Sequence, residues 1–94
     1  MISTHSSENN PKNEEIFIYI NGTLYPKNEA KISVYDSGFL LGDGVWEGIR
    51  LNNSEWIFLD EHLDRLFEAA KATGISPQLS REGMFSALEE TRLA

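Results

Sequence analysis

Three residues in the middle of the chain have the types and spacing to bind a small molecule: Trp46, Gly48 and Arg50. They lie in residues 34–50, a stretch that holds four of the seven glycines of the chain. If residues 45–51 form a strand, alternation places these three on one face and the residues between them on the other. That face offers an aromatic ring, a position without a side chain and a guanidinium, which suits a flat or carboxylate-bearing ligand. The alternative is a solvent-exposed face whose Trp46 covers a neighbouring strand.

A second arginine with possible chemistry, Arg65, lies in a segment whose apolar spacing predicts a helix over residues 60–73. Asp60 is the expected N-cap, and Gly74 stands where a C′ glycine belongs. The core stripe has the spacing i, i+3, i+4, i+7 and consists of Leu63, Leu66, Phe67 and Ala70. Arg65 lies on a neighbouring stripe with His62, so its guanidinium is expected in solvent.

From the residues alone, two roles for Arg65 stay open. A guanidinium presents a planar fork of donors that suits phosphate oxygens. The alternative is an ordinary helix-surface ion pair with Glu61 or Glu68, at spacings i, i+4 and i, i+3.

The remaining elements predict an α+β fold, an antiparallel sheet with two helices. Asn21-Gly22 joins residues 16–20 and 23–25 in a hairpin. The pattern also predicts a short strand over 32–35, a helical turn over 38–41 capped by Asp36 and Ser37, a second hairpin of 45–51 with 56–59, and a helix from Ser80 to Ala94. Residues 1–15 are expected to form a disordered tail before one domain over 16–94.

Composition excludes several classes of function. A net charge of −7 with eight scattered basic residues argues against nucleic acid and anionic membranes as partners. The chain has no cysteine, and its two histidines are far apart, so no metal site is expected. No apolar run approaches the ~20 residues of a membrane span, and the polar N-terminus is unlike a secretory signal. The expectation is a cytoplasmic protein.

Four separated pieces of the chain carry a family resemblance: I-Y-I-N-G at 18–22, D-S-G-F-L-L-G-D-G-V-W-E-G-I-R at 36–50, L-D-E-H-L-D-R-L at 59–66 and A-K-A-T-G-I at 70–75. In this order and at these intervals they resemble the N-terminal domain of class IV aminotransferases. That family comprises pyridoxal-phosphate enzymes of the branched-chain and D-amino-acid types, with aminodeoxychorismate lyase as a relative. The resemblance covers nearly all of residues 16–94.

The resemblance implies roles for individual residues. Arg65 matches the arginine that binds the phosphate of the pyridoxal 5′-phosphate cofactor. Trp46 and Gly48 match positions on the substrate side of the cofactor, where Trp46 is larger than the usual Phe or Tyr. Arg50 matches a basic position that favours carboxylates, and His62 is interpreted as structural. The implied function is transfer of an amino group between an amino acid, a branched-chain one first, and a 2-oxo acid, by a homodimer.

The covalent chemistry of the family needs a Schiff-base lysine, which lies far downstream in the second domain. The lysines of this chain, Lys12, Lys27, Lys31 and Lys71, occur in a tail, in turns and at a helix end. None has the buried setting that lowers a lysine pKa. The sequence also ends inside a predicted helix without a stop signal. We therefore expect the N-terminal domain of such an enzyme without its second domain. This domain is expected to have no catalytic residue and no activity alone.

Two alternatives stay open from the sequence. One is a stand-alone non-catalytic domain that binds a small anionic ligand or a partner chain. The other is a fragment of an aminodeoxychorismate lyase.

Overall fold

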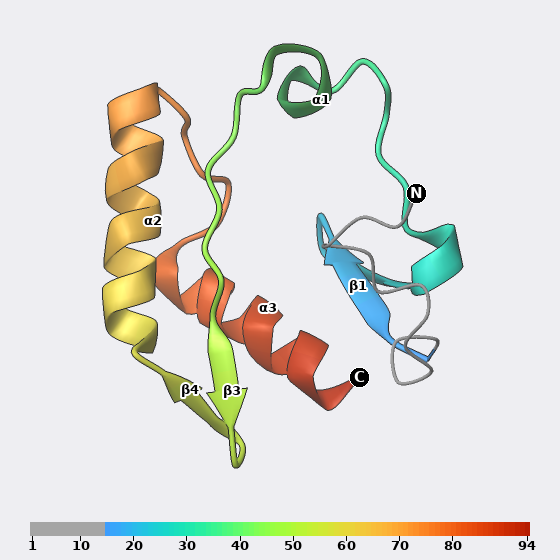
Figure 1. Cartoon of the computed structure of the whole chain (residues 1–94), viewed down its shortest axis with the longest axis vertical. Coiled ribbons are helices and arrows are strands. Elements are labelled where there is room, and N and C mark those ends of the chain that lie inside the picture. The colour runs from blue at the N-terminus through green and yellow to red at the C-terminus, as the bar shows by residue number, and fades with distance from the viewer. Residues whose placement is uncertain (1–14) are drawn as a thin grey trace, which may run out of the picture. The chain divides into compact units, whose positions relative to one another are not determined.

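The computed structural model describes residues 15–94, so the tail predicted over residues 1–15 lies almost wholly outside the described residues. Two antiparallel hairpins and two long helices confirm the α+β fold (Figure 1). The elements are β1 (Phe17–Ile20), β2 (Thr23–Pro26), the 3-10 turn η2 (Lys27–Glu29), α1 (Ser37–Leu41), β3 (Arg50–Asn52), β4 (Glu55–Ile57), α2 (Leu59–Thr73) and α3 (Arg81–Leu93). They fall into two compact units, residues up to 32 with 82–94, and residues 33–81.

The first unit contains the predicted N-terminal hairpin. Strands β1 and β2 pair from Phe17 opposite Pro26 to Ile20 opposite Thr23. Asn21 and Gly22 both have positive φ, 49° and 90°, as a two-residue type I′ turn requires. Helix α3 begins directly after the predicted cap Ser80, and all of it except Arg81 belongs to the same unit. The predicted apolar side of α3 is buried or half-buried: Met84, Ala87, Leu88 and Thr91.

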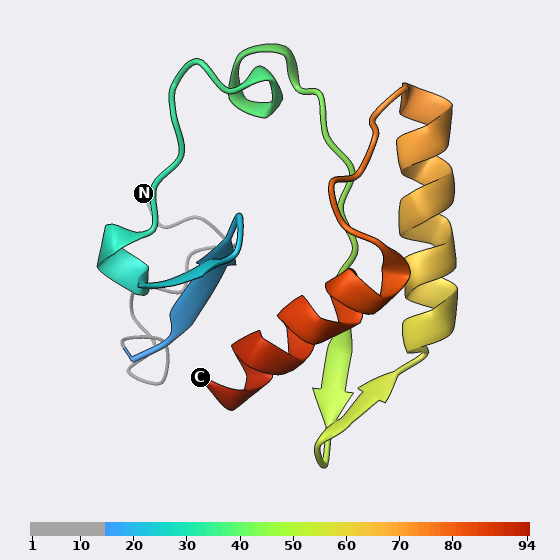
Figure 2. The ribbon, with the colours of Figure 1, turned by 180° about the vertical axis from the view of Figure 1, so that it is seen from behind.

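The second unit contains the other hairpin, which leads directly into α2 (Figure 2). Its strands pair from Arg50 opposite Ile57 to Asn52 opposite Glu55. The turn residues Asn53 and Ser54 both have positive φ, 51° and 64°, so this connection also twists like a type I′ turn.

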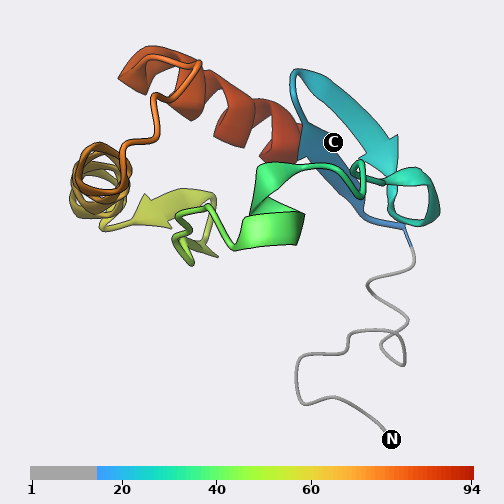
Figure 3. The same ribbon diagram turned by 90° about the horizontal axis from the view of Figure 1, so that it is seen from above.

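The short helix α1 has the predicted start. The Asp36 carboxylate accepts a hydrogen bond from the Gly38 amide at 2.8 Å. Figure 3 shows α1 as a short green helix. It ends at Gly42, whose φ of 74° is left-handed.

Helix α2 has the predicted core stripe but a different start. Leu63 and Ala70 are 2% and 1% exposed, and the helix ends at Gly74 with φ 76°, as predicted. Asp60 is not the N-cap. Helix α2 begins at Leu59, and the capping position is Phe58, with φ 53° and no side-chain hydrogen bond. Because the chain reverses directly after β4, Asp60 falls inside the first turn, where its charge still favours the helix dipole.

Three predicted strands are wrong or shortened. Residues 32–35 form no strand and end in a turn, with the Asp36 amide bonded to the Ser33 carbonyl at 3.1 Å. The strand predicted over 45–51 is reduced to Arg50–Asn52, and residues 42–49 have no regular secondary structure. The return strand ends at Ile57 instead of residue 59. A strand needs a neighbour for its backbone groups, and over residues 15–94 each hairpin pairs only within itself.

Large apolar side chains are exposed along residues 32–46. The first of these residues ends the first unit, and the others belong to the second unit. These apolar side chains are Ile32, Val34, Tyr35, Phe39, Leu40, Leu41 and Trp46. Within the described part of the chain, no helix combines the length and apolarity needed to cross a bilayer. The same residues contain no cluster of side chains suited to hold a metal ion.

Candidate functional site

Residues 42–49 connect α1 to β3 as an extended segment with two faces. Val45, Glu47 and Ile49 are half-buried, whereas Trp46 and Gly48 are exposed, as is Arg50 at the start of β3. The predicted division into two faces therefore holds, although most of the predicted strand is absent. A strand-like backbone alternates its side chains whether or not it is paired.

The three residues predicted to bind substrate share the exposed face. Trp46 is 84% exposed. A methyl group placed on Gly48 would lie 3.7 Å from Cζ3 of Trp46, so the indole ring lies beside the open position at Gly48. Within residues 15–94 the Arg50 side chain makes no ion pair, and its guanidinium is left for solvent or a ligand.

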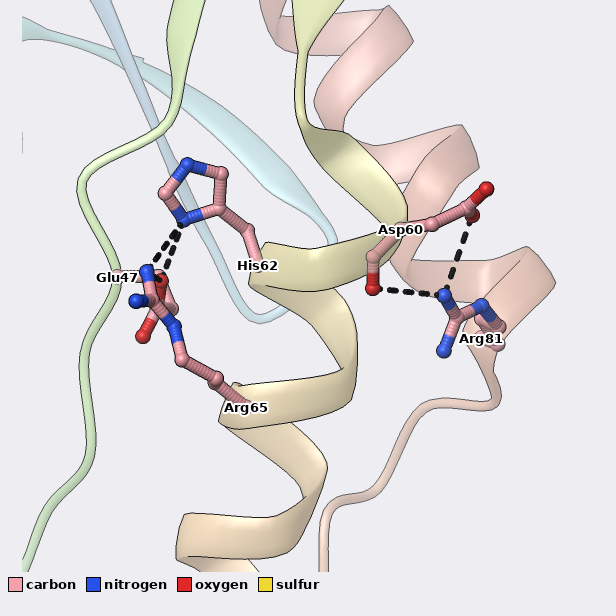
Figure 4. A network of polar contacts seen from close by, with 5 residues as sticks. All are labelled: Glu47, Asp60, His62, Arg65 and Arg81. Carbon is pink, nitrogen blue, oxygen red and sulfur yellow. Dashed lines mark hydrogen bonds and ion pairs between the residues drawn. The ribbon is translucent and has the colours of Figure 1, made fainter.

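The opposite face brings Glu47 to helix α2 (Figure 4). Its Oε1 lies 2.5 Å from Nδ1 of His62 and 2.7 Å from Nη2 of Arg65. His62 and Arg65 are three residues apart on α2, so their side chains lie on one face of the helix. The Glu47 and His62 side chains are only 15% and 17% exposed, whereas the Arg65 side chain is 66% exposed. The cluster thus has a covered carboxylate and an accessible guanidinium.

The short contacts decide which atoms carry protons. An ionised carboxylate only accepts hydrogen bonds, so Nδ1 of His62 must donate to Glu47. Nη2 of Arg65 lies 3.1 Å from the same Nδ1. Because Nδ1 already carries a proton, that approach is a contact between two donors that share one acceptor. The hydrogen bond from His62, followed by that from Arg65, holds the pKa of the Glu47 carboxyl below its ordinary value, against a smaller opposing effect of burial.

Arg65 keeps unused donors after its bond to Glu47. A guanidinium has five N–H groups, and the bond to Glu47 uses one on Nη2. The Nε–H and both Nη1 hydrogens have no partner within residues 15–94. The predicted surface pairs with Glu61 and Glu68 are absent among these residues; the partner of Arg65 is Glu47, 18 residues earlier.

A second arginine, Arg81, connects the start of α3 to the first turns of α2. Its Nη1 donates to Asp64 Oδ1 at 2.8 Å. Its Nη2 donates to the Asp60 carbonyl at 3.0 Å and to the Asp60 carboxylate at 3.2 Å (Figure 4). These bonds, to Asp64 first and Asp60 second, raise the pKa of Arg81. Arg81 and Arg65 border one shallow hollow, together with Asp64, Phe67 and Glu68. Sequence reasoning missed this contact because no local pattern relates Arg81 to Asp60.

Residues 44–92 match the family model described as amino-transferase class IV. The chain belongs to the class IV aminotransferase family. The matched span includes both the exposed face of Trp46, Gly48 and Arg50 and the cluster of Glu47, His62 and Arg65. In this family member Trp46, Gly48 and Arg50 share the exposed face, whereas Glu47 lies on the other face of the segment and contacts His62 and Arg65 of α2.

The relatives carry names of the branched-chain type and of the D-amino-acid type. A provisionally named branched-chain-amino-acid aminotransferase of Methanocaldococcus jannaschii is 45% identical over 74 residues, which cover 79% of this chain and 26% of the relative. Branched-chain-amino-acid aminotransferase-like protein 1 of Arabidopsis thaliana is 38% identical over 81 residues, 86% of this chain and 15% of the relative. The D-alanine aminotransferase of Bacillus licheniformis is 37% identical over 73 residues, 78% of this chain and 26% of the relative. The aligned part thus spans about a quarter, or less, of each of these relatives.

Proposed function

We propose that this chain forms the phosphate-binding part of a pyridoxal-phosphate-dependent aminotransferase, with Arg65 as the residue that binds the cofactor phosphate. The observation that carries the proposal is the exposure of Arg65 and its unused hydrogen-bond donors. Its side chain is two-thirds exposed, and its guanidinium is held at Nη2 by Glu47 and keeps Nε–H and Nη1–H groups for a ligand. Charge-assisted bonds from such donors contribute about 1.5 to 3 kcal/mol.

The residues present fit one part of the cofactor. Arg65 fits the phosphate, and the exposed face of Trp46, Gly48 and Arg50 suits the carboxylate-bearing amino acid and 2-oxo acid. The described lysines, Lys27, Lys31 and Lys71, are half-buried or exposed, so we assign the covalent link to none of them. When bound, pyridoxal phosphate supplies the electron sink for amino transfer. This chain binds and orients its phosphate.

Branched-chain amino acids are the first candidate substrates, because two of the relatives described above carry that name. D-amino acids are the second, because D-alanine aminotransferases also align. The two can be separated in a protein that carries this chain together with the rest of a full-length family member. The measurement compares the rate of amino transfer from L-leucine with the rate from D-alanine. The proposal includes a cytoplasmic homodimer, and the exposed apolar side chains along residues 32–46 are consistent with a covering partner.

The phosphate role can be tested on the 94-residue chain by calorimetric titration with pyridoxamine 5′-phosphate and with pyridoxamine. Both ligands lack the aldehyde, so neither forms an imine with surface lysines. Arg65→Ala should weaken binding of the phosphorylated ligand about tenfold or more, equivalent to about 1.4 kcal/mol, and leave pyridoxamine unchanged. Arg92→Ala removes the same charge from α3 and should alter neither titration.

Three results would overturn the proposal. Arg65→Ala could leave the phosphorylated ligand unaffected, or it could weaken both ligands equally. The unmodified chain could also show no binding of pyridoxamine 5′-phosphate at millimolar concentration.

A further inference from the structure

The carboxylate of Glu47 is an unexpected neighbour for a phosphate-binding arginine. Its Oε1 lies 2.7 Å from Nη2 of Arg65, and its negative charge opposes the binding of an anion nearby. A residue that acted through charge alone would therefore weaken the function proposed for Arg65. Any benefit of Glu47 to phosphate binding would have to be geometric.

We propose that Glu47 is a positioning residue that holds the guanidinium of Arg65 in the orientation used for phosphate. This inference rests on the proposed function of Arg65. Glu47 binds only Nη2, which leaves the Nε–H and both Nη1 hydrogens without a partner within residues 15–94 and fixes the plane in which they lie. Phosphate then meets a side chain that is already ordered. A free arginine would first have to give up its rotamer freedom.

His62 makes the carboxylate a fixed support. Its Nδ1–H and Nη2 of Arg65 donate to the same oxygen of Glu47, at 2.5 Å and 2.7 Å. His62 and Glu47 are both largely covered, and His62 belongs to the same helix face as Arg65. Within residues 15–94, residues 44–49 make no backbone hydrogen bond, so these side-chain bonds help to fix the carboxylate relative to α2.

Two other roles for Glu47 make different predictions. If Glu47 acts only through its charge, its removal strengthens phosphate binding, and Glu47→Ala and Glu47→Gln have the same effect. If Glu47 only fixes residues 42–49 to the helix, its loss alters phosphorylated and unphosphorylated ligands alike. Positioning predicts a loss that is specific to phosphate and that a neutral acceptor of the same shape restores.

The test compares Glu47→Ala with Glu47→Gln by the titrations described above. Glu47→Ala should weaken pyridoxamine 5′-phosphate about three- to tenfold and leave pyridoxamine unchanged. Glu47→Gln keeps an acceptor oxygen and loses the repelling charge, so its affinity should equal or exceed that of the unmodified chain. Adding Glu47→Ala to Arg65→Ala should cause no further loss, because Glu47 acts through Arg65.

A ligand-free measurement examines the positioning directly. In nitrogen-15 NMR spectra of the arginine side chains, rotation of the Arg65 guanidinium should be slow in the unmodified chain and in Glu47→Gln, and fast in Glu47→Ala. His62→Asn places an amide donor near the position of Nδ1 and should keep the slow rotation, whereas His62→Ala should lose it.

The outcomes separate the two proposals. If Arg65→Ala weakens the phosphorylated ligand but Glu47→Ala binds it as tightly as the unmodified chain or more tightly, the positioning role is wrong and the function of Arg65 stands. Fast guanidinium rotation in the unmodified chain would also overturn the positioning role. If Arg65→Ala has no phosphate-specific effect, the proposed function fails first.

Discussion

Replacing Gly48 by alanine should change the stability of the fold and the affinity for a ligand in different ways. The φ of Gly48 is outside the left-handed region, and the added methyl would meet its nearest atom, Cζ3 of Trp46, at 3.7 Å, an ordinary contact distance. With no strain to offset it, the reduced freedom of the unfolded chain should raise the free energy of unfolding by about 0.4 to 1 kcal/mol. For a domain of this size that is an increase in Tm of roughly 2 to 8 °C.

The same methyl would stand between Trp46 and Arg50 on the face proposed for the substrate. We therefore expect Gly48→Ala to weaken binding of a branched-chain 2-oxo acid to the chain saturated with pyridoxamine 5′-phosphate, measured by tryptophan fluorescence. Urea unfolding followed by circular dichroism gives the stability. Stability and affinity should change in opposite directions.

Two other glycines provide matched controls for Gly48→Ala. Gly44 has open space around a new methyl, so Gly44→Ala should be tolerated without loss of ligand affinity. At Gly38 the methyl would lie 2.9 Å from Oδ1 of Asp36 and 3.1 Å from the Asp43 carbonyl, so Gly38→Ala should destabilise. The reasoning is refuted if Gly48→Ala destabilises as Gly38→Ala does, or if the 44 and 48 variants bind ligand equally.

Four further outcomes are expected. Leu63→Ala removes a side chain that is 2% exposed and should cost about 2 to 5 kcal/mol in urea unfolding, whereas Leu93→Ala, at a position 72% exposed, should cost far less; equal losses would contradict the assigned core. Ser54→Gly relieves a φ of 64° and should add up to about 1 kcal/mol of stability, a gain that a melting curve would detect or exclude. Because the folded pKa of Glu47 is lowered from 4.5, its stabilising contribution should be complete above that pH and decline as pH falls through the lowered value; acid unfolding of Glu47→Gln should lack this part of the pH dependence. Borohydride treatment of the chain with pyridoxal phosphate should give no adduct at one defined lysine, and saturable trapping at a single site, lost on mutation of that lysine, would show the opposite.

Local chemistry explains which parts of the fold could be predicted from the sequence. Asn21-Gly22 and Gly74 tolerate positive φ, so the first hairpin and the end of α2 follow from residue type. The buried positions Leu63 and Ala70 follow from helical spacing. Each of these features depends on residues within one or two turns of chain.

The features that could not be predicted depend on distant partners. The alternation pattern placed Glu47 opposite the proposed substrate face, but nothing in it identified partners 15 and 18 residues later. The strand predicted at residues 32–35 failed for the same reason, since apolar alternation does not supply a neighbour to pair with. The left-handed φ of Phe58, 53°, is disfavoured for a bulky side chain, so residue type indicated the wrong cap.

The lack of backbone pairing in residues 44–49 has a consequence for time scales. No backbone hydrogen bond involving these residues occurs within the described part of the chain, so their amides have nothing to break before they exchange with solvent deuterium. They should exchange rapidly, whereas the amides in the middle of α2 should exchange slowly because the helix must first unfold locally. Meanwhile the carboxylate of Glu47 stays bonded to two side chains of that helix. Deuterium uptake would therefore show fast backbone exchange in residues 44–49 although the Glu47 side chain keeps a fixed position against α2. Only a probe of that side chain itself would detect its fixed position.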